Sequence, residues 1–560
     1  PTPTVAPTDT PEPTATPAPT PTPGPTAQPQ LHGEAAASAD PSKLISNPVI
    51  YDGGKSVTNY SRPETERINM QGGEEYNVLP LGILTFRGNA FRQNAAAGDV
   101  GRYTDMSLAW SADTGSLAGS NVTFYGVGYP GQPAIMKWSK EVRAASNISD
   151  EKKAVKSLKE VIMAAQDGKV YFLDLKDGKP TREALNVGYP MRGTPSIHPE
   201  GIPMMSVGQY ARKLKRSTGD IGLRFYNLYN QSFMYLLDGL DGRAKRPLNE
   251  VGSFQTSALI ARTEDNNETL VTAGTNGMLY TMKLGTQFDY KQGTLKMDPA
   301  TVSLRTQTDK KGKFNAVEAS VAAYGSYVFY ADLKGVLRCV DTTTMTTVWA
   351  VSLGDAVYAT PALDFDASGT LWVYVSNVLE NRAKGDVSIR RFNAMTGEEG
   401  WSVQVAVKKN NESKATAGAM ASPVIGSGEA SDLVYFTLSH LSPTQTFTLL
   451  GSDGAAAAGA VIAVSKSTGE VKWAYPLDAH TYSSPVLVKD QSGETRIIQA
   501  TNSGMLYSLS ALTGEIKGTL KLDGRIEGSP AVYGDMLVIG TTGKNGTHIY
   551  GVKLGDTSAE

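Results

Sequence analysis

The chain has 560 residues, of which 57 are Gly, and its 53 basic and 55 acidic side chains give a formal net charge of −2. No global field would therefore attract it to nucleic acid or to an anionic lipid surface. The length exceeds what one ordinary core supports, which leaves several domains or one architecture that grows by repetition. Abundant Gly and few helix-like periodic stretches favour an all-β class of short strands and tight turns.

The residues that most often carry chemistry are scarce. The single cysteine, Cys339, lies in the apolar stretch GVLRCV, so no intramolecular disulfide can form and we expect a small buried side chain. None of the five histidines lies in an H-E-x-x-H, H-x-H or G-x-S-x-G context, and no G-x-x-x-x-G-K-[ST] motif occurs. No run of about 18 apolar residues exists, so the sequence as given predicts no membrane span.

The N-terminal end is a low-complexity segment. Residues 1–30 consist mainly of Pro, Thr and Ala, a composition that removes backbone donors and leaves little apolar surface to bury. We predict a disordered Pro/Thr-rich stalk over residues 1–45, a lead-in over 46–107 and the main domain over 108–556. Such stalks resemble the linkers of exported domains in Gram-positive bacteria. Because the sequence starts at Pro1 rather than Met, we expect a signal or anchor upstream.

Two segments depart from a β pattern. The stretch ISDEKKAVKSLKEVIMAAQ (148–166) has apolar residues at helical spacing and a candidate N-cap at Ser149, which predicts a helix over a blade. Residues 208–231 are rich in basic and aromatic side chains. They predict a solvated loop, with an edge for an anionic or glycan ligand as the alternative. Their basic and aromatic members are Tyr210, Arg212, Lys213, Lys215, Arg216, Arg224, Tyr226 and Tyr229.

A landmark recurs along the main domain: a small residue or Gln, then Pro or a small residue, at the head of a short apolar strand. It begins at Gln132, Thr194, Thr256, Ala319, Thr360, Ser422, Ser484 and Ser529. The separations fit one four-stranded unit of about 40 to 45 residues with insertions. The sequence therefore predicts a repeat architecture of about eight units.

A second landmark lies between the first: an apolar strand with Tyr, a turn that ends in Gly, and often a Trp. AVIAVSKSTGEVKW (460–473) is one example. The pairs Thr396-Gly397, Thr468-Gly469 and Thr513-Gly514 supply the positive φ that a tight hairpin needs.

Together these landmarks resemble the pyrroloquinoline-quinone-type propeller repeat. That repeat is shared by quinoprotein alcohol dehydrogenases and by an outer-membrane assembly lipoprotein of the same fold. The resemblance implies a β-propeller of about eight four-stranded blades, in which Trp349, Trp401 and Trp473 pack between neighbouring blades.

The lead-in resembles that of exported Firmicutes propellers, where an Arg-rich loop precedes a strand that completes the last blade. The residues that carry this likeness are LPLGILTFRGNAFRQNAAAG (79–98) and MSLAWS (106–111). The resemblance implies that residues 106–111 pair with HIYGVKL (548–554) and close the ring, which would leave no open sheet edge.

The side chains just before the Ser-Pro landmarks should converge at the mouth of a central channel, because a propeller brings one loop per blade to a common axis. They are Arg192, Gln255, Glu318, Tyr358, Met420, Tyr482 and Glu527. All but Met420 are candidate ligand residues. Arg192 offers a forked donor to a carboxylate or sulfate, and Tyr358 and Tyr482 offer flat faces to a sugar ring. The alternative is a channel that these side chains fill without a ligand.

A quinoprotein dehydrogenase would need its quinone, a Ca²⁺ ion held by carboxylate and amide oxygens, and an Asp base. The predicted mouth lacks that set of side chains, so we expect no cofactor, no metal and no catalytic residue. His480, close to the entrance, is expected to be a hydrogen-bonding loop residue.

The sequence thus predicts a monomeric, extracellular, cell-surface binding or scaffold propeller whose partner is an envelope protein or a glycan. The alternative is a quinone-dependent dehydrogenase or another catalytic propeller.

Overall fold

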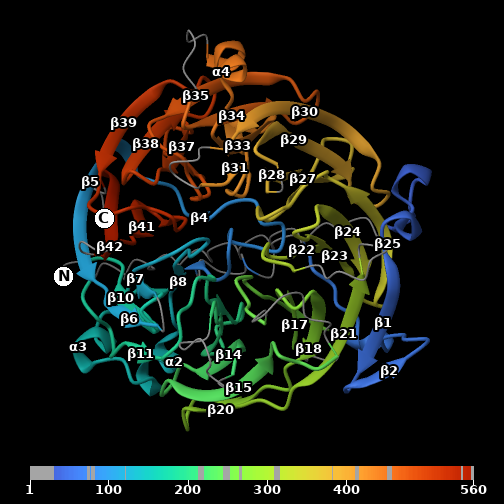
Figure 1. Ribbon diagram of the computed structural model, residues 1–560. Helices are drawn as coiled ribbons and strands as arrows, with labels where there is room; N and C mark the ends of the chain where they lie inside the picture. The colour runs from blue at the N-terminus through green and yellow to red at the C-terminus, as the bar shows by residue number, and fades with distance from the viewer. Residues whose placement is uncertain are drawn as a thin grey trace, which may run out of the picture. The chain divides into compact units, whose positions relative to one another are not determined.

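The computed structural model describes residues 31–71, 76, 82–119, 122–211, 220–243, 252–263, 268–307, 316–380, 382–409, 415–450, 457–543 and 547–556. The chain divides into two units, Pro1–Leu31 and His32–Glu560. The stalk predicted for the first 30 residues lies outside the described residues. Within the second unit, sheets succeed one another around a common centre (Figure 1), with the first strand of each sheet inside and the last outside.

Eight of the described sheets have four or more strands, and we number them as blades 1 to 8 in chain order. Blade 1 holds β8 (Ala134–Met136), β9 (Glu160–Ala164), β10 (Lys169–Asp174) and β11 (Leu185–Asn186). Blade 2 holds β12 (Ser196–Ile197), β13 (Met204–Gly208), β14 (Gly222–Asn227) and β15 (Ser232–Asp238). Blade 3 holds β16 (Leu259–Arg262), β17 (Glu268–Ala273), β18 (Met278–Lys283) and β21 (Ala300–Gln307). Blade 4 holds β22 (Ala322–Tyr324), β23 (Tyr327–Ala331), β24 (Val336–Asp341) and β25 (Thr346–Ser352).

The second half of the ring repeats the plan. Blade 5 holds β26 (Ala362–Phe365), β27 (Leu371–Ser376), β29 (Lys384–Asn393) and β30 (Glu399–Lys408). Blade 6 holds β32 (Val424–Ile425), β33 (Leu433–Ser439), β34 (Gly459–Ser465) and β35 (Val471–Leu477), with β28 (Val378–Leu379) and β31 (Ala417–Gly418) added at its inner edge. Blade 7 holds β36 (Val486–Lys489), β37 (Thr495–Ala500), β38 (Met505–Ser510) and β39 (Ile516–Lys521). Blade 8 holds β40 (Ala531–Tyr533), β41 (Met536–Gly540), β42 (His548–Asp556) and β5 (Arg102–Asp113).

The predicted eight-bladed propeller is confirmed, because each of the eight landmarks heads the first strand of its own blade. Closure of the ring is confirmed as well. Within β5 and β42, Tyr550 pairs with Ser111 and Val552 pairs with Leu108, in antiparallel register. The last blade is therefore completed by a strand from the start of the domain.

The hydroxyl groups of the landmarks join one blade to the next. The backbone N–H of Thr360 donates to Ser422 Oγ at 2.9 Å, Ser422 N–H to Ser484 Oγ at 3.0 Å, and Ser484 N–H to Ser529 Oγ at 3.0 Å. These groups are buried, so each hydroxyl satisfies a backbone donor that water cannot reach. The preference for Ser or Thr at the landmark results from this contact.

Tryptophans fasten the outer strands to the following blade, as the repeat implies. Trp349 Nε1 donates to Ala394 O at 2.8 Å, Trp401 Nε1 to Lys466 O at 2.8 Å, and Trp473 Nε1 to Ala511 O at 3.0 Å. The Thr-Gly turn of the next blade lies against each indole. Gly469, for example, has φ +77°, and a Cβ there would lie 2.9 Å from Trp401. The turn therefore requires Gly for its conformation and for its closeness to the ring.

Residues 82–98, which we call the strap, run through the centre of the ring. Apart from the bonds of two arginines and two glutamines, their hydrogen bonds reach blades 1 to 8 in chain order, at or next to the first strand of each blade. The strap includes β3 (Gly82–Ile83), which pairs with β8 of blade 1, and β4 (Ala96–Ala97), which pairs with β40 of blade 8. The label of β4 lies toward the centre of the ring in Figure 1, as do those of β8 and β22. Contacts to the blades between are backbone or side-chain hydrogen bonds: Ile197 N to Leu84 O, Phe86 N to Ser257 Oγ, Ala323 N to Ala90 O, Leu363 N to Phe91 O, Ile425 N to Gln93 O and Leu487 N to Asn94 Oδ1.

Two buried arginines of the strap bind carbonyl oxygens from several blades. Arg92 donates to Val321 O at 2.8 Å and to Ser257 O at 2.7 Å, in addition to bonds within the strap. Arg87 donates to Pro485 O at 2.6 Å and to Pro423 O at 3.2 Å. Both side chains are completely buried, and the carbonyl oxygens replace the water that a buried guanidinium loses.

Residues before the strap also lie on the ring. In β1 (Ser46–Asp52) and β2 (Lys55–Val57) they add two strands to the outside of blade 3, with Ile50 opposite Leu304 of β21. The turns η1 (Ala37–Ala39) and η2 (Pro41–Lys43) come after a segment in which Glu34 N donates to Met395 O. Part of the segment assigned to the linker by composition, residues 33–43, therefore contacts blades 4 and 5.

The helix predicted over 148–166 is wrong for most of its length. Only α3 (Asp150–Lys153) forms there, with Ser149 as its N-cap, while Glu160–Ala164 is the central strand β9. The run EVIMA is buried throughout, and a strand buried on both faces has no alternating pattern to distinguish it from a helix. Two other short helices, α2 (Lys140–Ala145) and α4 (Pro443–Leu450), lie between strands.

The segment 208–231 is only partly the predicted loop. Residues 212–219, with their four clustered basic side chains, lie outside the described residues. Residues 222–227 form strand β14, in which the Arg224 guanidinium lies 4.7 Å from the centre of the Tyr189 ring. Arg224 is therefore buried between strands and unavailable to a ligand.

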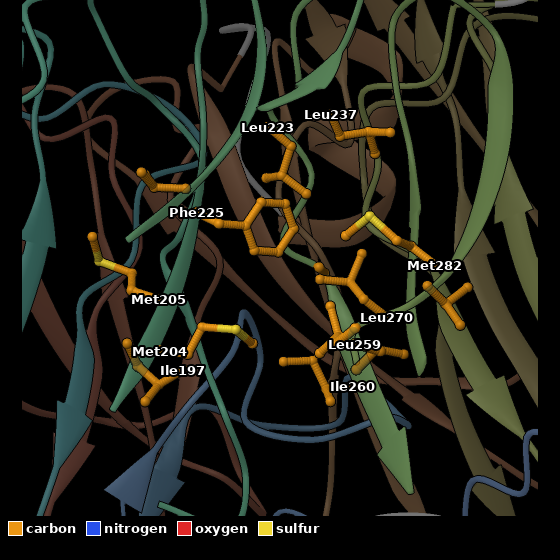
Figure 2. Packing of buried hydrophobic residues seen from close by; sticks show 14 of the residues in the cluster. Ile197, Met204, Met205, Leu223, Phe225, Leu237, Leu259, Ile260, Leu270 and Met282 are labelled. Atoms are coloured by element: carbon orange, nitrogen blue, oxygen red, sulfur yellow. The ribbon is translucent and has the colours of Figure 1, made fainter. Parts of the chain in front are cut away.

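Apolar residues fill the spaces between blades. Figure 2 shows side chains of blade 2 facing those of blade 3, and the labelled residues are Ile197, Met204, Met205, Leu223, Phe225, Leu237, Leu259, Ile260, Leu270 and Met282.

Cys339 is buried in β24 and is a free thiol, as predicted. Among the described residues, no helix is long and apolar enough to cross a bilayer.

Candidate functional site

The residues predicted to line the channel mouth, which together we call the mouth, are linked by contacts and electrostatic interactions. They are Arg192, Gln255, Glu318, Tyr358, Met420, Tyr482 and Glu527, one from each of blades 2 to 8. Arg192 and Gln255 act on Glu318, while Tyr358, Met420 and Tyr482 belong to one apolar cluster, and Glu527 acts on Tyr482. The strap binds the same segments a few residues farther along, for example at Ile197 and Leu363. Because a strand rises about 3.3 Å per residue, the strap lies deeper along the axis than the mouth.

Blade 1 contributes a residue that the predicted set omits, Tyr129. Its hydroxyl lies 3.0 Å from Tyr358 O and 2.9 Å from Met420 O, so a residue of blade 1 reaches blades 5 and 6 on the other side of the ring. Its ring meets that of Tyr482 edge-on at 6.0 Å. Extending the repeat alignment to the first landmark points to Gly131 or Pro130, so the alignment comes within one residue of Tyr129 but does not identify it.

Tyr129 lies on an apolar floor. Ala356, Val378 and Met420 pack with it, and Tyr358 and Tyr482 flank the cluster as half-buried side chains. Burial raises the pKa of the Tyr129 phenol well above its usual range, so the hydroxyl stays protonated and donates to the carbonyl oxygens. The centre of the mouth is therefore filled by a side chain of the chain itself.

Blades 2 to 4 supply the charged half of the mouth. Burial raises the pKa of the Glu318 carboxyl to about 7, against the opposing effects of the Arg192 charge and of a hydrogen bond from Gln255. Arg192 and Glu318 interact electrostatically but form no ion pair within the described residues. At neutral pH a substantial fraction of Glu318 is thus protonated.

Arg192 is held in one orientation. Its Nε donates to Gln166 Oε1 at 2.9 Å, and its guanidinium carbon lies 3.6 Å from the centre of the Tyr210 ring. Within the described part of the chain, its two terminal nitrogens have no hydrogen-bond partner. The side chain is half-buried, so this edge of the guanidinium remains available to a ligand.

Blades 6 to 8 supply an arc of aromatic and polar side chains beside Tyr482. The His480 ring lies 5.5 Å from that of Tyr482 and 5.4 Å from that of His440. Burial lowers the pKa of both imidazoles, to about 4 for His440, so both are neutral at neutral pH. Asn502 Nδ2 lies 2.5 Å from His480 Nε2, which supports the hydrogen-bonding role expected for this histidine. Glu527 lies 3.8 Å from Arg525.

Among the described residues, no three His, Cys, Asp or Glu side chains are close enough together to hold a metal ion. Burial disfavours the charged form of Glu318, and the Tyr129 side chain reaches across the mouth to Tyr358 and Met420.

Residues 291–497 match the family model described as outer membrane protein assembly factor BamB, and no curated protein matches the chain. Among solved structures, BamB from Moraxella catarrhalis is similar at 13% identity over 72% of this chain and 92% of that one, with a TM-score of 0.43. A europium-containing methanol dehydrogenase is similar at 13% identity over 86% and 100%, with a TM-score of 0.42. A quinohemoprotein alcohol dehydrogenase from Comamonas testosteroni is similar at 11% identity over 85% and 81%, with a TM-score of 0.39.

The segment that matches the family model runs from the end of blade 3 into blade 7, and the other blades share the same landmarks and the same four-stranded plan. The chain is therefore an eight-bladed β-propeller in which residues 291–497 match this family model.

Proposed function

We propose that this chain is an extracellular, cell-envelope-associated propeller that binds a protein or glycan partner and catalyses no reaction. The observation that carries the proposal is the filled axis. Tyr129 joins opposite blades at the mouth and the strap binds every blade beneath it, so the accessible chemistry is the ring of half-buried side chains around Tyr129.

The composition of the mouth favours recognition over catalysis. It combines a guanidinium, an amide, two carboxyls and tyrosine rings, which are groups that hydrogen-bond and stack on polar ligands. The balanced net charge disfavours nucleic acid as a partner. The family that matches residues 291–497 is named for outer-membrane assembly, and a scaffold role at the envelope is of the same class.

The N-terminal composition supports a place at the cell surface. The Pro/Thr-rich residues 1–30 would act as a spacer that reaches at most about 3 Å per residue. Such a spacer would hold the propeller away from the envelope as a monomer, free to meet its partner.

The proposal is tested with the purified full chain. We expect it to retain a protein from detergent-solubilised envelope, or to bind discrete members of a glycan array, and to remain monomeric in sedimentation. The alternative, a quinone-dependent dehydrogenase, predicts a quinone absorbance band and dye-linked alcohol or sugar oxidation after addition of the quinone with Ca²⁺. Turnover in that assay, or no binding to either collection, would overturn the proposal.

Variants of the mouth locate the binding surface. Replacing Arg192 and Glu318 with Ala should weaken binding, while the thermal transition shifts little, because partly exposed loop positions usually cost within about 0.5 kcal/mol of stability. Gln255, Tyr358, Tyr482 and Glu527 complete the proposed set. If both variants bind as the parent does and remain folded, the site lies elsewhere, and residues 208–231 are the next segment to test.

A further inference from the structure

The mouth is divided into two chemically different halves. Arg192, Gln255 and Glu318 come from consecutive blades and form a charged, hydrogen-bonding side. Tyr358 and Tyr482 lie on the other side, with Tyr129 between them. A ligand that spans the mouth therefore meets a fixed cation at one end and aromatic faces at the other.

The cation is prepared for a planar anion. Because Nε is already bonded to Gln166 and one face of the guanidinium is stacked on Tyr210, the two terminal nitrogens are the groups left to donate, and they lie in a fixed plane. Two parallel donors at this spacing match the two oxygens of a carboxylate. The stack also limits the rotamer entropy that Arg192 loses when it binds.

Glu318 makes the charged half sensitive to protonation. The groups that act on its carboxyl are the apolar surroundings that desolvate it, Arg192 and Gln255, which favour the anion, and Glu380, which disfavours it. The phenols of Tyr129 and Tyr358 feel the Glu318 charge in turn. When protonated, Glu318 can donate a hydrogen bond to a ligand carboxylate, and when ionised it repels that carboxylate.

We propose that the mouth binds an acidic sugar, with the sugar carboxylate on the free edge of Arg192 beside Glu318 and the sugar ring against Tyr358 and Tyr482. This inference rests on the proposed binding function and specifies its ligand. A uronic acid residue satisfies both halves of the mouth at once, because it joins a planar carboxylate to a ring whose C–H face packs on an aromatic side chain.

The test is calorimetric titration of the full chain with an oligoglucuronate and with the neutral glucose oligomer of the same linkage and length. We expect the acidic oligomer to bind at least about tenfold more tightly at pH 6. Its affinity should fall about tenfold between pH 6 and pH 8, because a carboxyl with a pKa of about 7 passes from mostly protonated to mostly ionised over that range. Equal affinity for the two oligomers would overturn the inference.

Three variants assign the effect to named groups. Arg192→Gln should remove the preference for the acidic oligomer, and Arg192→Lys should restore little of it, since an ammonium supplies charge without the fork. Glu318→Gln should bind at pH 8 as the parent binds at pH 6. Arg390→Gln, which removes a cation paired with Glu399 in the outer half of blade 5, is the matched control and should change nothing.

Two further results separate this inference from the proposed function. A chain that binds an envelope protein or a neutral glycan, with Arg192→Gln binding equally well, would overturn the acidic-sugar assignment alone. A chain that binds neither would overturn both. A peptide with a free C-terminal carboxylate tests whether a sugar is required, with the amidated peptide as its control. If the free peptide binds as tightly as the oligoglucuronate and the amidated peptide does not, the mouth recognises carboxylates without requiring a sugar. The inference would then be wrong.

Discussion

The hydroxyl of Ser484 illustrates how one small side chain connects neighbouring blades. It accepts the backbone N–H of Ser422 from blade 6, while the N–H of Ser484 itself donates to Ser529 in blade 8. Ser483, the preceding residue, is equally buried, but its hydroxyl has no hydrogen-bond partner within the described residues. The two adjacent serines are thus equally buried, but only the Ser484 hydroxyl forms a hydrogen bond between blades.

This pair provides a matched test. Ser484→Ala should lower the free energy of unfolding by about 1–3 kcal/mol, because it leaves the buried Ser422 N–H unsatisfied. Ser483→Ala should change it by less than about 0.5 kcal/mol, because no bond is lost. Urea denaturation of both variants measures the difference, and equal effects would contradict the assigned role of the landmark hydroxyl.

At the same scale, the sequence allowed the mouth residues to be grouped but provided no information about the side chains around them. Repeat alignment places one side chain per blade at a common axis, so Arg192, Glu318 and Tyr482 could be grouped without coordinates. Tyr129 could not be found in this way, because the same offset from the landmark Gln132-Pro133 gives Pro130 or Gly131. The stacking of Arg192 on Tyr210 could not be found, because it depends on how two segments of blade 2 fold back on each other.

Among the elements, the outer turns combine a backbone requirement with a packing requirement. Gly469 and Gly493 both have positive φ, +77° and +92°, but a Cβ at Gly469 would lie 2.9 Å from Trp401, while one at Gly493 would have nothing within 4 Å. Gly493→Ala should therefore cost about 1 kcal/mol of backbone strain. Gly469→Ala should cost at least about 1 kcal/mol more, from overpacking against the indole. Thermal unfolding of the two variants gives the comparison, and equal losses would show that the indole yields without cost.

The strap is the element that no periodicity in the sequence reveals. Successive residues of the strap contact successive blades, so its apolar and polar residues follow neither the two-residue period of a strand nor the helical period. The run EVIMA (160–164) was wrongly predicted as part of a helix, because a uniformly apolar run fits a buried helix and a buried strand equally well. Strand positions next to the landmarks could be predicted, since the repeat itself marks them.

Removing one strap arginine should therefore affect several blades at once. Arg92→Met should lower the free energy of unfolding by about 3–5 kcal/mol, because several buried carbonyl oxygens lose their donor. Arg67→Met, which removes an exposed arginine next to Glu64, should have little effect. If Arg92→Met does not fold, a Lys in its place, which keeps the charge but not the fork, should fold with an intermediate loss. Parental stability in Arg92→Met would show that the strap is dispensable.

For the whole molecule, the junction between blade 8 and blade 1 has the same tryptophan hydrogen bond as the junction between blades 4 and 5. Trp110 of β5 donates from Nε1 to Leu175 O of blade 1 at 2.9 Å, just as Trp349 of blade 4 reaches blade 5 at 2.8 Å. A Cβ at Gly178 would lie 2.5 Å from Trp110, which repeats the packing of the other turns. The ring thus has the same kind of contact at its seam as between blades that are adjacent in sequence.

Trp110→Phe and Trp349→Phe should consequently have similar effects, each lowering the free energy of unfolding by about 2–3 kcal/mol through a lost hydrogen bond and lost packing. Both variants should still unfold in one transition by circular dichroism and by tryptophan fluorescence, with the same urea dependence. A separate early transition in Trp110→Phe alone would mean that the seam opens independently of the other blades.

The order of the strap contacts has a consequence for how such a chain can change. Ile83 meets blade 1, Leu84 meets blade 2, and the series ends with Ala95 and Ala97 at blade 8. A repeat protein can gain a unit when the DNA that encodes one blade is duplicated. Here a ninth blade would have no contact residue in the strap, and the strap contacts of all following blades would be displaced by one blade. Gain or loss of a blade would require a simultaneous insertion or deletion in the distant stretch of the gene that encodes the strap, so the strap holds this lineage to eight.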